Sequence, residues 1–470
     1  MTSTTPTPST GKVRRDVLGG KRGAGHAYQD RGERVRRPDP TKVTTAGTTE
    51  RLTSAAGLVA FGQFLRQQGI DRELHSSFDG LKTGHGVVYS MANQMRLMLD
   101  AHVAGESRVF GIEALASDPV FVRLAGGTVP CVDTLYRDLG RFDENAVRTL
   151  EAVMAHWGTD LDALRRLRRA HLDIDTSVLP VHGAHEGALP GYNPRFHGRP
   201  SYHPLVARWA ELDTCMAALL RPGDTTFGEA DAETVRKLVR RGRAALTPKQ
   251  ELVVRMDSAA DCAGILQTIV AEDADFVVKA RMTRDLRDGI ANTTSWTTVD
   301  RDADGKPTTQ VAEISFARGE WLSRGLRVRV VAVRTTEPRS GKQLFLWDDL
   351  EYTVKAYLTT TTDSPLEVMR CYEDRAGVET LIAEWKGGWG LGDVPCWGFE
   401  ANHAAFLLKL LAHNLFRRFV STVIPVLAAA KWRVQWLRRG LIRVPGQLVR
   451  SGRSWVLRVP ALSPLAHLLE

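Results

Sequence analysis

Three short β-rich runs constrain the fold of this chain more than any other feature. They are HLDID (171–175), ELVVRMD (251–257) and DFVVKAR (275–281), and the helical segment DAETVRKLVRRGRAAL lies among them. In these runs the hydrophobic period is about 2, whereas the preceding sequence follows the helical period of about 3.6. Strands interleaved with helices favour an α/β layer fold. We therefore predict an α/β core for the middle of the chain.

The sequence before this core predicts a helical domain. The first 50 residues are rich in Thr, Pro, Gly and Arg and hold almost no large apolar residues, so we expect a disordered basic arm. Helical spacing follows, with helices that end at Gly69 and Gly105. The run TVPCVDTLYRDLGRF places Arg137 and Arg141 on a short helix, which either reads DNA in a helix-turn-helix or packs as an ordinary helix.

A second strand pattern lies between residues 285 and 360. TTSWTTVD, TTQVAEISFA, LRVRVVAVRT and LEYTVKAYLTT are consecutive strand-like runs with turn residues between them. They predict an antiparallel β block inserted into the α/β core. The segment DRDADGKPT starts like a calcium-binding loop. Because Val311 stands where that loop needs a bidentate Glu, we predict a hairpin turn instead.

The next helix is well delimited by its sequence. Ser364 and Glu367 form a capping box, Pro365 occupies the first helical position, and Gly387 and Gly388 end the helix. We expect it to run for about 22 residues, or ~33 Å.

Four polar residues form one stripe on this predicted helix. At about 100° per residue, the side chains of Tyr372, Arg375, Glu379 and Lys386 fall within an arc of about 60°. The stripe borders the apolar face of the helix. Glu379 is therefore expected at the edge of a core and between cations, which is typical of a functional site.

Two aspartates, Asp175 and Asp257, stand at the carboxyl ends of α/β strands, where open sheets bind their ligands. Together with Glu379 they offer a set of hard oxygen ligands suited to Mg²⁺ or Mn²⁺. A pair of such ions can activate a water or a 3′ hydroxyl on one side of a phosphodiester and stabilise the leaving oxygen on the other. Asp173 lies on the same strand face as Asp175, which leaves the identity of the first ligand open.

The spacing Y-x2-R-x3-E-x6-K, formed by the four polar residues of the helix, resembles the signature of bacterial insertion-sequence transposases of the DDE type. The segment LDIDTSVLPVHGAHEGALPGYNPRFHGRPSYHPL is similar to the first-aspartate region of DDE transposase group 1. The resemblance covers about residues 165–420. It implies a ribonuclease H-like core, an inserted β domain before the last acid, and Asp175, Asp257 and Glu379 as catalytic metal ligands.

The resemblance also assigns roles in DNA binding. It implies that Tyr372, Arg375 and Lys386 hold DNA phosphates near the cut end, a role that suits an Arg fork and a Lys point charge. In relatives the β insertion can supply a Trp that stacks on a displaced base. The candidates, which could equally stack on a core, are Trp296, Trp321 and Trp347.

Charge and composition agree with a nucleic-acid partner. The chain carries a net charge of +9 at pH 7, which favours a polyanion. Residues 401–469 contain no Asp or Glu, and arginines there alternate with Trp432, Trp436 and Trp455. This region suits contact with a phosphate backbone, although a solvated basic surface gives the same pattern.

Other motifs indicate less. Four histidines of one loop-rich segment could bind zinc, but loop hydrogen bonding or DNA contact suits them better, because no cysteine is near. They are His182, His185, His197 and His203. The five cysteines form no CxxC pair and no apolar run is long enough to span a membrane. We therefore expect reduced thiols and a cytoplasmic, nucleoid-associated bacterial protein.

We thus predict a cut-and-paste DNA transposase that needs Mg²⁺ or Mn²⁺, with two ions, and acts as a homodimer on double-stranded DNA at terminal inverted repeats and target sites. The alternatives are a ribonuclease H-like nuclease without strand transfer and a non-catalytic, transposase-derived DNA-binding protein. The predicted domains are a disordered basic arm (1–50), a helical DNA-binding domain (51–164), the ribonuclease H-like core (165–284 and 351–420), a β insertion (285–350) and a basic C-terminal region (421–470).

Overall fold

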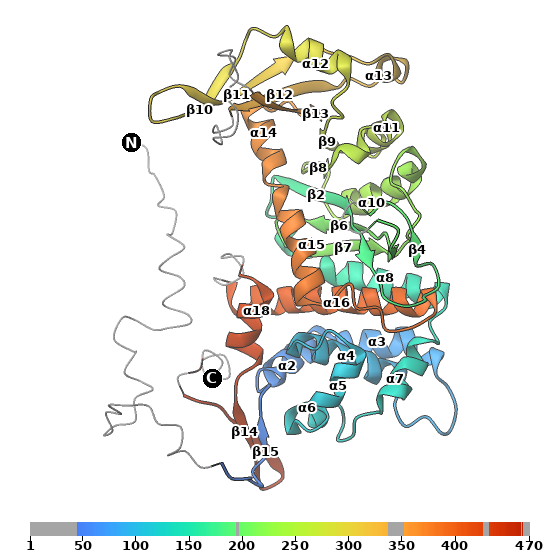
Figure 1. Cartoon of the computed structure of the whole chain (residues 1–470). Coiled ribbons are helices and arrows are strands. Elements are labelled where there is room, and N and C mark those ends of the chain that lie inside the picture. The colour runs from blue at the N-terminus through green and yellow to red at the C-terminus, as the bar shows by residue number, and fades with distance from the viewer. Residues whose placement is uncertain (1–44, 194–196, 337–351, 426–431, 462, 464–470) are drawn as a thin grey trace. The chain divides into compact units, whose positions relative to one another are not determined.

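The structure is a computed structural model, and it describes residues 45–193, 197–336, 352–425, 432–461 and 463 (Figure 1). The chain folds into two compact units. One contains residues Glu151–Ala383, and the other combines Met1–Leu150 with Glu384–Glu470. The predicted arm, residues 1–50, lies almost wholly outside the described residues.

A nine-stranded mixed sheet forms the centre of unit Glu151–Ala383. Its first five strands in chain order lie side by side as β7-β6-β2-β8-β9. The pairs β7–β6 and β6–β2 are antiparallel, and the pairs β2–β8 and β8–β9 are parallel. This arrangement confirms the predicted α/β, ribonuclease H-like fold class. The bounds are β2 (Arg169–Thr176), β6 (Leu205–Trp209), β7 (Thr214–Leu219), β8 (Glu251–Met256) and β9 (Asp275–Lys279).

The strands of the predicted insertion lengthen this same sheet. β13 pairs antiparallel with β9, and β12, β11 and β10 follow as an antiparallel meander. The block is therefore antiparallel, as predicted, but it does not form a sheet of its own. The DRDADGKPT segment is a hairpin turn between β10 and β11. The bounds are β10 (Thr297–Arg301), β11 (Pro307–Ile314), β12 (Arg329–Thr336) and β13 (Tyr352–Thr359).

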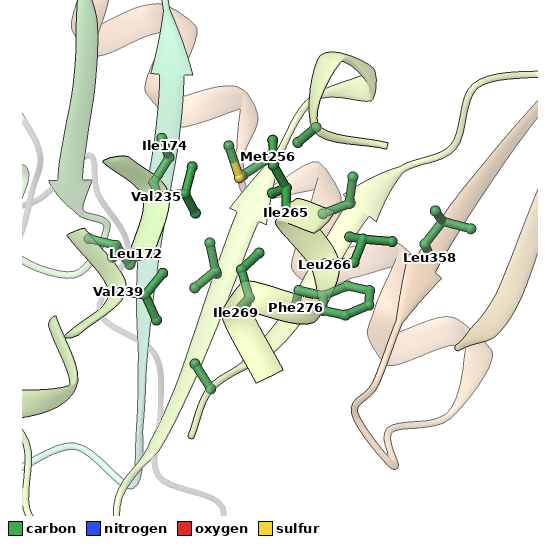
Figure 2. Close-up of a cluster of buried hydrophobic side chains, with 14 of the residues drawn as sticks. Leu172, Ile174, Val235, Val239, Met256, Ile265, Leu266, Ile269, Phe276 and Leu358 are labelled. Carbon is green, nitrogen blue, oxygen red and sulfur yellow. The ribbon is translucent and has the colours of Figure 1, made fainter. Parts of the chain in front are cut away.

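The two faces of the sheet carry different helices, because successive side chains of a strand point to opposite faces. Leu172 and Ile174 of β2 pack with Val235 of α10 (Ala232–Ala244) and Ile265 of α11 (Ala263–Ala271) in one large apolar cluster (Figure 2). On the opposite face, α14 (Pro365–Glu373) buries Val368 and Met369 against the sheet. The odd-numbered residues of β2, which include both of its aspartates, face this second side.

The helix predicted over residues 364–388 is two helices. The capping box of Ser364 and Glu367 is present as predicted, but α14 ends at Glu373 and α15 spans Ala376–Gly388. At the junction the amide of Arg375 donates to the carbonyl of Tyr372 at 2.9 Å, a bond that spans three residues instead of four. This tighter turn breaks the register of the helix, so the four polar residues do not share one continuous stripe.

Unit Met1–Leu150 with Glu384–Glu470 joins helices to a small antiparallel sheet, β1-β14-β15. Helices end at Gly69 and Gly105 as predicted, each glycine in the left-handed conformation. The main elements are β1 (Leu52–Thr53), α2 (Leu58–Gln68), α3 (Ile70–Phe78), α4 (Met91–Ala104), α6 (Pro119–Leu124), α7 (Val132–Leu139), α8 (Glu144–Gly158, which continues past Leu150), α16 (Phe399–Val423), α18 (Val434–Leu437), β14 (Gly446–Ser451) and β15 (Ser454–Arg458).

Candidate active site

Strand register aligns the first two predicted acids. β2 and β8 run parallel, and their register pairs Asp173 with Arg255, 82 positions later in the chain. The same offset leads from Asp175 to Asp257, which directly follows the last residue of β8. Both aspartates therefore stand at the carboxyl ends of neighbouring parallel strands and on the face that α14 covers. This is the edge where open α/β sheets place reactive groups.

Asp175 is the most confined of the three acids. Its side chain is 13% exposed, its Oδ2 lies 3.1 Å from Nη2 of Arg375, and its Oδ1 accepts a hydrogen bond from the amide of Thr176. Burial raises the pKa of Asp175 to about 6. The guanidinium of Arg375 opposes this rise, while the charges of Asp257 and Glu379 add to it. Asp175 therefore lies within the electrostatic reach of both other predicted acids.

The remaining two acids are more accessible than Asp175. Asp257 is half-buried and caps the short 3₁₀ turn Ser258–Ala260, since its Oδ1 accepts from the amide of Ala259 at 3.0 Å. Glu379 is exposed in the first turn of α15. Their side chains can reorient more freely than that of Asp175.

The charges of all three acids act on the hydroxyl of Tyr372. Burial raises the pKa of its hydroxyl to about 12. Arg375 opposes this effect, and the carboxylates of Asp257, Asp175 and Glu379 reinforce it. The Tyr372 ring stacks on that of Tyr357 with centroids 4.5 Å apart. The end of α14 is thus fixed against β13 beside the acids.

Arg375 turns inward at the junction of α14 and α15. It is 4% exposed, and its guanidinium carbon lies 5.8 Å from the centre of the Tyr372 ring. Neither its Nε nor its Nη2 has a hydrogen-bond partner among the described residues, so its contact with Asp175 is an ion pair without a hydrogen bond. Lys386 is half-buried in the last turn of α15 and belongs to the other compact unit. The structure therefore brings Tyr372 and Arg375 to the acids, and places Lys386 at the other end of α15 from Glu379.

Asp173, the alternative first ligand, has a different environment. It is fully buried; Arg208 donates to its Oδ2 at 2.9 Å, and Arg255 donates to both oxygens at 2.6 and 3.0 Å. Arg255 also donates to the carbonyl of Cys371 on α14 at 2.7 Å. Asp173 therefore links three strands and a helix beneath Asp175. Sequence reasoning missed both arginines, although an Arg inside each apolar run LVARW and LVVRM is an unusual feature that calls for a buried partner.

The described residues contain no ready arrangement of three or more His, Cys, Asp or Glu side chains that could hold a metal ion. Arg375 forms an ion pair with Oδ2 of Asp175, and the side chain of Glu379 is exposed to solvent. The donors present are carboxylate oxygens, the kind that Mg²⁺ and Mn²⁺ take. The donor set thus fits a divalent ion in chemistry, while Oδ2 of Asp175 is paired with the guanidinium of Arg375.

The predicted tryptophan and histidine sites have varied outcomes. Trp321 is buried in the core, Trp347 lies outside the described residues, and Trp296 is half-buried with Arg334 4.2 Å from its ring centre. Among the histidines, His185 contacts the carbonyl of His182 at 2.9 Å. The ring of His182 contacts Arg199, and the ring of His203 hydrogen-bonds to the carbonyl of Thr225, so hydrogen bonding accounts for these three histidines.

The sequence profile of the family "Transposase DDE domain group 1" matches residues 36–470. The chain belongs to this family. It is a DNA transposase of the DDE type, an enzyme that cleaves DNA and transfers strands, and such transposases use divalent metal ions. The two alternatives considered above, a nuclease and a non-catalytic relative, have no support.

The transposase was also compared with known proteins and solved structures. No curated protein matches its sequence. A solved structure described as the "Cryo-EM structure of piggyBac transposase synaptic complex with hairpin DNA (SNHP)" is 12% identical, with a TM-score of 0.44, over 81% of this chain and 78% of that chain. Similarity at this level adds nothing to the family assignment. In the described part of the transposase, no helix is long and apolar enough to cross a membrane.

Proposed function

We propose that Asp175, Asp257 and Glu379 are the catalytic acids of this transposase and together hold two Mg²⁺ or Mn²⁺ ions. The observation that carries the proposal is the register of β2 and β8, which puts both aspartates at one sheet edge. The charge of Glu379 acts on Asp175 at the same place. When bound, such ions activate the attacking oxygen and stabilise the leaving oxygen of a phosphodiester.

The side chains around the acids have complementary tasks. Arg375 neutralises Asp175 while no ion is bound, and if an ion took its place at Asp175 its fork would be available to a DNA phosphate, where Arg binds two oxygens at once. Tyr372 remains protonated at neutral pH because its pKa is about 12, so its hydroxyl donates a hydrogen bond to a phosphate oxygen. Lys386 adds a positive charge further along α15 for the DNA backbone.

A cysteine-rescue experiment tests the ligand assignment. Asp175→Asn, Asp257→Asn and Glu379→Gln should each abolish Mg²⁺-dependent cleavage of a labelled element end while DNA binding is kept. Asp175→Cys should be inactive in Mg²⁺ and partly active in Mn²⁺, because thiolate is a poor ligand for Mg²⁺ and a better one for softer ions. Asp374→Asn, at an exposed neighbour of Arg375, is the matched control and should cleave normally. Full cleavage by Glu379→Gln would refute the assignment.

We further propose that the transposase works as a homodimer on double-stranded DNA and joins the terminal inverted repeats to target DNA. Cut-and-paste transposition holds two ends at once, which supports this stoichiometry. Light scattering of the purified complex with one terminal repeat should give two protein chains per particle. We also propose a nucleoid-associated location in the bacterial cytoplasm; a DNA substrate suits the nucleoid, and cysteines that form no disulfide suit a reducing compartment.

A further inference from the structure

The small sheet of unit Met1–Leu150 with Glu384–Glu470 carries a dense group of arginines around one tryptophan. The guanidinium carbons of Arg51 and Arg123 lie over the ring of Trp455, 4.6 and 4.7 Å from its centre. Arg450 stands directly opposite Trp455 in the β14–β15 register, and Arg453 occupies the hairpin turn. We call these four arginines and Trp455 the Trp455 cluster.

The geometry of the hairpin fixes the positions of these cations. Ser451 pairs with Ser454, so the turn has two residues, and Gly452 takes a φ of 59° at its first position. A positive φ at this position is what tight hairpin turns require, and Gly adopts it without strain. Cross-strand partners have Cβ atoms about 5 Å apart. Arg450 is therefore held beside the tryptophan, and Arg453 is held at the tip next to it.

Nothing in the described residues neutralises these charges. All four arginines are exposed, Trp455 is half-buried, and no ion pair joins any of the four to a carboxylate. Glu50, next to Arg51 in sequence, forms no ion pair with it among the described residues, and Asp118 accepts hydrogen bonds from Thr53, Val120 and Phe121. Residues 401–469 contain no Asp or Glu.

Placing like charges so close has an electrostatic cost. Arg51 and Arg123 both stack on one ring, so their charges are within roughly 10 Å, about one screening length in 0.1 M salt. Such a cluster is stabilised when a polyanion supplies the missing negative charge, and a row of phosphates does so at regular spacing along a duplex.

We propose that the Trp455 cluster is a docking surface for the phosphate backbone of double-stranded DNA, separate from the catalytic acids. The proposal rests on the proposed function, because it takes DNA as the partner. The stacked guanidiniums of Arg51 and Arg123 are held flat by Trp455 and lose little freedom on binding. Phosphate contacts position a protein on DNA without reading the base sequence. The surface would therefore bind element ends and flanking DNA equally well.

Salt-dependent DNA binding by the full-length transposase tests this surface. Each phosphate contact contributes about 0.9 to the slope of log K against log salt. The double substitution Arg450→Gln with Arg453→Gln should reduce the slope by up to about 2 and weaken binding to a terminal repeat and to an unrelated duplex equally. The matched control is Arg66→Gln with Arg72→Gln, which removes the same charge from exposed sites on α2 and α3.

Three outcomes separate the possibilities. A smaller slope for the cluster variant than for the control supports the proposal, provided that both melt at the wild-type temperature. Equal slopes overturn it. Loss of binding to vesicles that contain phosphatidylserine, with unchanged DNA binding, also overturns it and indicates an anionic membrane as the partner. Because Asp175→Asn should bind DNA normally but not cleave it, failure of the catalytic assignment and failure of this surface give different results.

Discussion

Nη2 of Arg375 lies 3.1 Å from Oδ2 of Asp175, and both side chains are withdrawn from solvent, at 4% and 13% exposure. The pair joins the junction of two helices to the end of the first core strand. The positive charge of Arg375 compensates the charge of Asp175, as a bound divalent ion would, and so offsets the repulsion of Asp175 by Asp257 and Glu379. The pair therefore predicts a link between ion binding and stability.

Arg375→Gln should make the stability of the transposase depend more strongly on Mg²⁺. Breaking a buried ion pair by removing one partner costs about 3 kcal/mol or more, because Asp175 is left beside the charges of Asp257 and Glu379. Without Mg²⁺ the melting temperature of the variant should fall clearly, and Mg²⁺ should recover more of it than in the wild type. Arg370→Gln, at an exposed site on α14, is the control. An identical loss with and without Mg²⁺ would contradict the exchange of partners.

Asp173 and Asp175 should respond differently to the same substitution. Asp173→Asn leaves the buried guanidiniums of Arg208 and Arg255 without their charge partner, so we expect a loss of about 3–5 kcal/mol in the free energy of unfolding. Asp175→Asn also leaves the buried guanidinium of Arg375 without its charge partner, but it relieves the repulsion from Asp257 and Glu379, so it should lose less stability than Asp173→Asn and should lose cleavage. Thermal melting and a cleavage assay on both variants check this. A stable but inactive Asp173→Asn would return that residue to the catalytic set.

The contrast between these aspartates shows what sequence alone could predict. Strand ends, which are local features of two short runs, predict Asp175 and Asp257 as site residues. The sequence does not decide the role of Asp173, because residues two apart on a strand share a face and a pattern cannot distinguish them. Its partners Arg208 and Arg255 come from two other strands. Only the pairing of those strands, a long-range property, makes Asp173 structural.

The prediction of one continuous helix over residues 364–388 was wrong because it also ignored a long-range contact. The stripe of Tyr372, Arg375, Glu379 and Lys386 follows from an unbroken helix, and Gly377, a poor helix former, is the weak sign of a break that helical spacing alone does not capture. Arg375 nevertheless leaves the helical register, because Asp175 attracts it from a distant strand. The strands of the predicted insertion were identified correctly, yet the pairing of β13 with β9, which merges them with the core sheet, depends on an edge that only the fold supplies.

His171 should make the stability of unit Glu151–Ala383 sensitive to alkaline pH. Burial and the charge of Arg255 lower its pKa, but hydrogen bonds to Cys371 and to Glu211, 2.6 Å away, prevail and raise the pKa to about 9. A pKa raised above the unfolded value of 6.5 stabilises the fold by up to about 3 kcal/mol, fully below pH 6.5, and this gain is lost as pH rises through about 9.

Melting curves at several pH values check the role of His171. His171→Gln should lower the melting temperature near pH 6.5, where the wild type is protonated, and the difference between the two proteins should shrink as pH rises past about 9. Glu211→Gln removes the main carboxylate partner and should give a similar profile. A destabilisation that stays constant over this pH range would show that His171 acts through packing and not through its charge.

Gly377 should be intolerant of a side chain, whereas Gly387 on the same helix should not. A Cβ at Gly377 would lie 2.9 Å from Nη2 of Arg208. The side chain of Arg208 cannot move away easily, because its Nε and Nη1 form ion pairs with Asp173 and Asp213. Gly377→Ala should therefore displace the first turn of α15, which carries Glu379, and reduce cleavage more than DNA binding, at a stability cost of about 1–3 kcal/mol. At Gly387 a Cβ meets nothing within 4 Å, so Gly387→Ala should be neutral or stabilise by about 0.5–1 kcal/mol. If the two substitutions changed the cleavage rate equally, the position of Glu379 would not depend on the close approach of Gly377 to Arg208.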